Sequence, residues 1–271
     1  MQLAEPVAAS WKASLSLDFQ CVNEKTILAG RRSEGPLMVQ KPLYPEGDAV
    51  CHAIVVHPPG GIAGGDELDL QVSDEAGSSA LLTTPGAGKW YRTAGPWARQ
   101  RLAFDVGGTL EWLPRETIVF DGARAALECD IRLGDAARYI GWEVVCLGRT
   151  GSGERFRRGE LRVETRITRD KKMVFLERGR IEGGGRLMSS PVGLDGKTVF
   201  GTLLATVENL EASVLRECRS LAAVTLLPGL LVARTLGDSS EQAMQGFIRL
   251  WKLLRPHVAR RQAVEPRIWA T

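Results

Sequence analysis

Three histidines and five cysteines are the side chains of this 271-residue sequence best suited to hold a transition metal tightly. His52 and His57 lie five residues apart on one expected strand, so their side chains are predicted to point to opposite faces. No two cysteines form a C-x-x-C pair, and no cysteine and histidine share the spacing of a zinc site. The sequence therefore predicts no tightly bound metal or other cofactor.

Carboxylates are the other groups that could do chemistry, as general acids and bases. Glutamates stand in or beside expected strands at Glu111, Glu116, Glu143, Glu154, Glu160, Glu164 and Glu177. A β-sandwich hydrolase that uses a pair such as Glu111 and Glu116 is one alternative function. Their spacing of five would place them on opposite faces of a strand, which weakens this alternative. The tripeptide Gly151-Ser152-Gly153 lacks the G-x-S-x-G frame of a serine nucleophile.

A glycine-rich segment, residues 57–66, follows an apolar expected strand. Such a loop can cradle a phosphate when a helix begins directly after it. Here residues 67–72 alternate in polarity as a strand does, and no Lys-Ser or Lys-Thr pair follows the glycines. The segment is therefore predicted to be a tight connection between strands rather than a nucleotide site.

The elements that position these residues show mainly a period of two, which is typical of strands with one buried face. Alternating apolar residues include Ala13, Leu15, Leu17 and Phe19, then Leu68, Leu70 and Val72, then Leu102, Phe104 and Val106. Residues 50–56 and 139–147 are apolar on both faces and indicate central strands. Turns at residues 75–77, 106–108 and 194–196 separate the segments, and an Asp-Gly pair such as Asp195-Gly196 favours a tight hairpin. We expect a mostly β fold, an antiparallel or mixed sheet sandwich or stacked sheets, in a single domain over residues 1–271.

Two helices are expected near the C-terminus, over residues 208–221 and 238–254. Asp238 and Glu241 have the spacing of a capping box at the start of the second helix. Its apolar stripe includes Phe247 and Trp251 and is expected to pack on the chain's own sheet. Pro256 is expected to end this helix.

Composition excludes several classes of function. The net charge is +3, from 35 basic and 32 acidic residues, and no basic run suggests binding to nucleic acid. The odd number of cysteines argues against a disulfide framework and fits a reducing compartment. The apolar runs are too short to cross a bilayer, and the first residues lack the features of a signal peptide. A cytoplasmic protein, bound to neither membrane nor nucleic acid, is expected.

Short motifs occur in order over nearly the whole chain. They cover residues 35–40, 44–46, 57–62, 64–66, 83–87, 110–114, 116–118, 148–149, 250–251, 254–256 and 266–269. Among them are His57-Pro58-Pro59-Gly60-Gly61 and Pro266-Arg267-Ile268-Trp269. With this ordered set, the sequence resembles the UreD (UreH) family of urease accessory proteins. Gly88 departs from the family, which often carries a larger polar residue there.

The resemblance implies a scaffold that is not itself an enzyme. It would bind apo-urease and UreF, and through UreF the GTPase UreG, to help insert nickel into the urease active site. Family members are thought to offer a water-filled passage for nickel in transit. An ion in such a passage needs polar walls that bind it weakly. The candidates for these walls are Asp66, Glu111, Glu116, Glu154, Glu164 and Glu177.

The C-terminal stretch is the expected partner surface. Arg255, Arg267 and Trp269 are its candidate anchors, because arginine and tryptophan often dominate the binding energy of protein interfaces. A terminal segment has little cause to be ordered unless a partner binds it. Arg267 and Trp269 are therefore expected to dock UreF.

Overall fold

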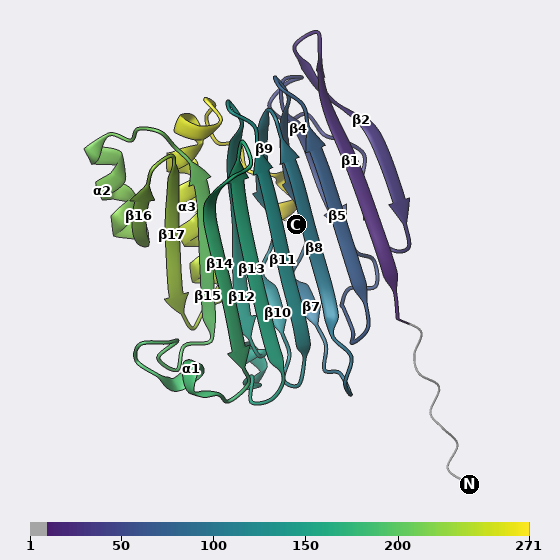
Figure 1. The fold of residues 1–271 in the computed structure, drawn as a ribbon, viewed down its shortest axis with the longest axis vertical. Helices are drawn as coiled ribbons and strands as arrows, with labels where there is room; N and C mark the ends of the chain where they lie inside the picture. The colour runs from purple at the N-terminus through teal and green to yellow at the C-terminus, as the bar shows by residue number, and fades with distance from the viewer. Residues whose placement is uncertain (1–9, 271) are drawn as a thin grey trace.

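The computed structural model describes residues 10–270, which form two stacked β-sheets with helices on one side (Figure 1). We call the sheet with one free face the outer sheet and the sheet between it and the helices the central sheet. One apolar cluster fills the space between the sheets, and a second lies between the central sheet and helices α2 and α3. The expected mostly β fold with two helices near the C-terminus is confirmed.

The outer sheet has seven strands. In spatial order they are β14 (Lys172–Glu182), β13 (Glu160–Arg169), β11 (Arg124–Leu133), β8 (Ala98–Val106), β5 (Glu67–Asp74), β1 (Lys12–Val22) and β2 (Lys25–Glu34). The five inner strands are mutually parallel, and the two edge strands run antiparallel to their neighbours.

The central sheet has ten strands. Its main path is β16 (Ala223–Leu227), β17 (Leu230–Gly237), β15 (Val199–Thr206), β12 (Arg138–Leu147), β9 (Thr109–Leu113), β6 (Ser79–Thr83), β4 (Cys51–Val56) and β3 (Met38–Val39). Beside this path, β10 (Thr117–Val119) pairs with β12, and β7 (Gly88–Trp90) pairs with β10. The sheet is therefore mixed, with parallel strands in its middle.

The chain winds back and forth between the two sheets from β4 to β13. The turns at residues 75–77 and 106–108 each cross from the outer sheet to the central sheet. At the second crossing, a Cβ on Gly108 would lie 2.3 Å from the carbonyl oxygen of Ser78. The glycine thus permits a close crossing between layers rather than a reversal within one sheet. The hairpin expected at Asp195-Gly196 is wrong, because this pair lies between β14 of the outer sheet and β15 of the central sheet.

The burial pattern follows the sequence period. Leu15, Leu17 and Phe19 are buried between the sheets, while the alternate side chains of β1 lie on the free face of the outer sheet. Strands β4 and β12 are apolar on both faces because the central sheet is covered on both sides. They are the central strands that the sequence predicts.

Helix boundaries differ from the expectation. Helix α2 is Ala212–Leu221, and α3 is Ser240–Val258. The cap of α3 is Ser239, whose Oγ accepts a hydrogen bond from the Gln242 amide at 3.2 Å. Asp238 instead pairs with Lys197. Pro256 lies inside the last turn of α3 rather than ending it.

Three short elements complete the fold. They are helix α1 (Arg186–Ser189) and two 3₁₀ helices, η1 (Thr150–Ser152) and η2 (Arg267–Ala270). Between residues 10 and 270, no helix combines the length and the apolar character that a membrane span requires. Residues 1–9, on which the signal-peptide expectation rests, lie outside the described part of the chain.

Candidate ion passage between the sheets

Two cavities open between the outer and the central sheet. The first has a volume of about 290 Å³ and the second about 470 Å³. Four residues line both cavities: Gln100, Leu102, Trp112 and Glu143. The cavities are therefore neighbours inside the sandwich, and together they are a candidate passage.

Glu143 is in the walls of both cavities. It lies on β12, and its carboxylate accepts a hydrogen bond from the Thr117 hydroxyl at 2.5 Å. Burial raises the pKa of Glu143 to about 7, while the Thr117 bond opposes this rise. Both the neutral and the charged carboxyl are therefore populated near neutral pH. The six passage candidates from the sequence omit Glu143, although it is the only charged residue in the apolar run of residues 139–147.

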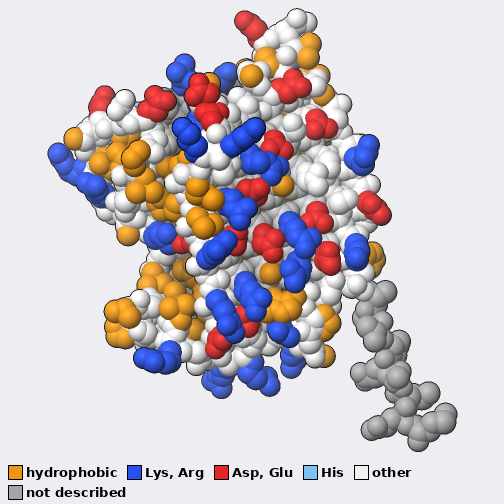
Figure 2. Space-filling view, viewed as in Figure 1, with side chains coloured by type: hydrophobic (Ala, Val, Ile, Leu, Met, Phe, Trp, Pro, Cys, Tyr) orange, Lys and Arg blue, Asp and Glu red, His pale blue; other side chains and the backbone are white. Residues whose placement is uncertain are grey.

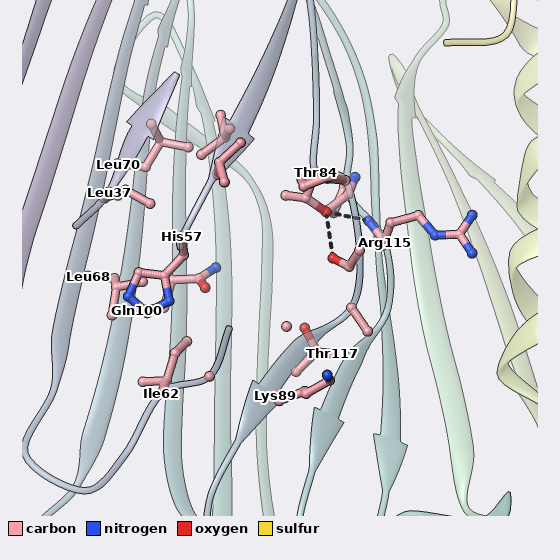
Figure 3. A pocket seen from close by; sticks show the side chains of 18 of the residues that line it. Leu37, His57, Ile62, Leu68, Leu70, Thr84, Lys89, Gln100, Arg115 and Thr117 are labelled. Atoms are coloured by element: carbon pink, nitrogen blue, oxygen red, sulfur yellow. Dashed lines mark hydrogen bonds between the residues drawn. The ribbon is translucent and has the colours of Figure 1, made fainter. Parts of the chain in front are cut away.

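The first cavity is walled by both sheets and by two loops. Figure 3 shows His57 and Gln100 on one side of it, with Thr84 and Thr117 on the other. The Thr84 hydroxyl accepts a hydrogen bond from the Arg115 amide at 2.9 Å and so fixes this loop. The glycine-rich segment, residues 57–66, thus helps to build a cavity wall, beyond the strand connection that the sequence predicts.

The second cavity opens at the edge where β14 faces β17. Glu177 of β14 and Arg234 of β17 form an ion pair across this opening and so join the two sheets. Leu187 and Leu236, both exposed, line the same cavity. Figure 2 shows hydrophobic side chains gathered in two areas near α1 and near β16 and β17, with charged side chains between them.

Two of the six predicted carboxylates line a cavity. Glu177 points into the space between the sheets toward Arg234. Glu164 borders the second cavity, but its carboxylate is held by Arg166 and Arg178, both at 2.9 Å. Both carboxylates that line the second cavity are therefore paired with arginines, Glu177 across the gap between the sheets and Glu164 within the outer sheet.

Three other candidates lie outside both cavities. Asp66 is buried and accepts hydrogen bonds from the amides of Trp11 and Ala63 at 2.8 and 2.7 Å, so it holds its own loop. Glu154 is paired with Arg149. Glu116 lies 3.7 Å from its neighbour Arg115. None of these three carboxylates lines either of the two cavities.

Glu111 and Arg255 form a buried ion pair on the helix side of the central sheet. Both side chains are 0% exposed, and their closest atoms lie 2.9 Å apart. Glu46 closes the cluster, since its carboxylate lies 2.6 Å from the Arg255 guanidinium, and Trp251 donates a 2.6 Å hydrogen bond to Glu111. Glu111 therefore lines neither cavity, and the Arg255 side chain is not exposed on the surface.

The C-terminal segment is ordered on the chain's own fold. The Trp269 indole donates a 2.9 Å hydrogen bond to the Thr83 hydroxyl, and its ring packs near those of Trp142 and Trp251. Arg267 is exposed. The premise that a partner is needed to order this tail is wrong, while the role of Arg267 in docking stays a prediction.

The fold is a β protein of two stacked sheets with two neighbouring cavities between them. In residues 10–270, no three histidine, cysteine, aspartate or glutamate side chains are grouped so as to hold a metal ion. The pattern of the family described as "UreD urease accessory protein" matches residues 12–270. The chain therefore belongs to the UreD family of urease accessory proteins.

Similar proteins bear the same description. A urease accessory protein UreD of Azoarcus sp. (strain BH72) is 52% identical over 269 residues, which cover 96% of this chain and 94% of that protein. UreD of Dechloromonas aromatica (strain RCB) is 50% identical, over 97% of this chain and 95% of its own length. UreD of Pseudomonas savastanoi pv. phaseolicola is 51% identical, over 97% and 96%. The resemblance inferred from short motifs thus extends along the chain.

Proposed function

We propose that this protein acts in the cytoplasm as a scaffold that binds apo-urease and UreF, and through UreF the GTPase UreG, and passes nickel toward the urease active site. It holds no metal permanently. The observation that carries the proposal is the pair of neighbouring cavities between the sheets, with Glu143 in the walls of both. The family assignment supports the urease context.

The physical case rests on how a divalent ion crosses a protein. An apolar core would impose a prohibitive desolvation cost, so an ion needs water and polar walls. Gln100, Thr117 and Glu143 supply such walls in the first cavity, and Glu143 and Glu177 supply carboxylates in the second. Oxygen ligands that are not grouped into a closed site bind an ion weakly enough for it to move on.

Partner binding is tested by co-purification. The full-length tagged chain is expressed with the urease subunits and UreF, and both are expected to be retained with it. UreG should be retained only when UreF is present. Retention of neither urease nor UreF would overturn the scaffold role.

The passage is tested by removing its central carboxylate. Glu143→Gln keeps the shape of the side chain and is expected to lower the nickel content and activity of co-expressed urease, without loss of complex. The matched control is Asp69→Asn, because Asp69 lies on the free face of the outer sheet near Arg101. Equal urease nickel content in the two variants would contradict a passage through the sandwich.

The hydrolase alternative receives no support from the geometry. It needs two carboxylates that act on one bond. Glu111 is held by Arg255 and Trp251 beneath α3, while Glu116 lies beside Arg115. The two carboxylates are thus engaged separately, and neither lines a cavity described above.

A further inference from the structure

His57 is the only described imidazole that lines either cavity of the passage. It follows the end of β4 and lies near Gln100 and Leu68 on one wall of the first cavity (Figure 3). Its Nε2 is shut off from solvent and has no hydrogen-bond partner within the described chain. Buried polar groups are nearly always hydrogen-bonded, so an exception calls for a cause.

The other two histidines differ from His57. The Nε2 of His52 lies 2.6 Å from the Glu46 carboxylate, in the buried cluster with Arg255. His257 is exposed on α3 and lines neither cavity of the passage. Burial lowers the pKa of His57, with a smaller opposing effect from Asp66. The His57 imidazole is therefore neutral at neutral pH, which is the form that binds metals.

We infer that His57 is the nitrogen ligand of a transient metal station in the first cavity, which makes the passage prefer nickel-like transition ions to Mg²⁺ and Ca²⁺. This inference rests on the proposed passage and adds selectivity to it. Carboxylates, amide oxygens and water suit Mg²⁺ and Ca²⁺, whereas an imidazole favours transition metals. Gln100 and Glu143 line the same cavity and supply oxygen ligands beside water.

A site with only one imidazole ligand would also let the metal ion leave again. Tight sites use three or four protein ligands at fixed geometry, and no such cluster exists among residues 10–270. In the position observed, Nε2 is closed off, so the ring has to turn toward the cavity for an ion to reach it. The station therefore holds an ion only while it passes.

The test measures metal binding by the full-length chain, without urease. Equilibrium dialysis with Ni²⁺ alone and with Mg²⁺ alone compares the wild type, His57→Gln and His257→Gln. Loss of an outer partner of a metal ligand typically lowers affinity 10- to 100-fold, so loss of the ligand should cost at least about tenfold for Ni²⁺. Affinity for Mg²⁺ should not change in His57→Gln, and His257→Gln should match the wild type.

Nickel-edge X-ray absorption of the His257→Gln chain gives a second measurement, which does not depend on the folding of a His57 variant. Imidazole scattering from bound nickel is expected. Three results would overturn the inference: unchanged Ni²⁺ affinity in His57→Gln, an equal loss for Ni²⁺ and Mg²⁺, or nickel with oxygen and water ligands only. None of these results affects co-purification with urease, so the failure of the station and the failure of the scaffold role are distinguishable.

Discussion

Arg255 shows how one side chain holds distant parts of the molecule together. Its guanidinium bonds Glu111, Glu46 and the Gln262 carbonyl, and it is fully buried. A buried ion pair is costly to form, but removal of one partner leaves an uncompensated charge. Arg255 neutralises two buried carboxylates, Glu46 and Glu111, so its removal would leave both charges buried without a partner.

We predict that Arg255→Met lowers the free energy of unfolding by about 3–5 kcal/mol. Arg132→Met is the matched control: Arg132 pairs with Asp105 on the free face of the outer sheet and should change stability by less than about 1 kcal/mol. Urea unfolding of the two variants gives the comparison. Similar decreases in the free energy of unfolding for the two variants would show that burial does not make the Arg255 ion pairs more important for stability than the exposed Arg132 pair.

Asp74 predicts a pH dependence of stability. Burial raises its pKa to about 7, although Ser78 and the Gly108 amide donate hydrogen bonds to it. The folded state therefore holds this proton more tightly than the unfolded chain does, so stability is lost as the pH rises from about 4 through 7. Above pH 7 the cost is at most on the order of 4 kcal/mol.

Asp74→Asn isolates this effect. An asparagine can still accept from the Gly108 amide and can donate to the Ser78 hydroxyl, as a protonated aspartate would. We expect unfolding of this variant to depend less on pH between 5 and 8 than unfolding of the wild type. Parallel stability curves for the two proteins would be evidence against a protonated Asp74 in the fold.

At the scale of elements, glycines show where two segments leave no room for a side chain. Gly159, before β13, has φ +98°, and a Cβ there would lie 2.1 Å from the Ala123 carbonyl oxygen. Gly246 lies inside α3, and a Cβ there would meet nothing within 4 Å. The same substitution should therefore have opposite effects at the two positions.

Gly159→Ala is predicted to lower the melting temperature, because both the backbone conformation and the contact oppose a methyl group. Gly246→Ala should raise stability by about 0.5–1 kcal/mol through helix propensity. Thermal unfolding of the two variants measures both effects. Stabilisation by Gly159→Ala would contradict the close approach described here.

The C-terminal tail is an element of the fold. Truncation after Glu265 removes Trp269 from its place beside Trp142 and Trp251, and we predict a lower melting temperature. Arg267→Ala should leave the melting temperature unchanged, because Arg267 is exposed. If Arg267→Ala also retains UreF in a pull-down, the docking role of this arginine is excluded.

The sequence predicts the outer sheet well, since each of its inner strands has one buried and one solvated face. The run of residues 139–147 likewise indicates a strand covered on both sides. The role of Glu143 could not be predicted from this run, because the sequence does not show that a cavity lies beside the strand. The pairing of Glu111 with Arg255 could not be predicted for a related reason. The two residues are 144 positions apart, and only the fold brings them together.

At the scale of the whole molecule, the cavities lie between the two sheets, where side chains do not fill all of the space. The Glu177–Arg234 pair joins the sheets at the open edge, while apolar contacts join them elsewhere. The chain therefore encloses two cavities with a few polar side chains in their walls, and its described residues form no cluster of strong metal ligands.

We predict that the purified full-length chain, after desalting, carries well under one nickel or zinc ion per molecule. The reason is that tight binding requires several convergent ligands, which residues 10–270 do not bring together. Elemental analysis by mass spectrometry gives the answer. One retained ion per chain would reveal a closed site.

The contact between Glu46 and Arg255 affects how the protein can fold during its synthesis on the ribosome. The two residues are 209 positions apart, so the cluster cannot form until Arg255 has left the exit tunnel. Until α3 arrives, the helix-facing side of the central sheet and the unpaired Glu46 and Glu111 stay exposed. Chains dominated by such distant pairings fold slowly and are prone to aggregate. The yield of soluble protein should therefore depend on how quickly α3 is made and docked on the central sheet.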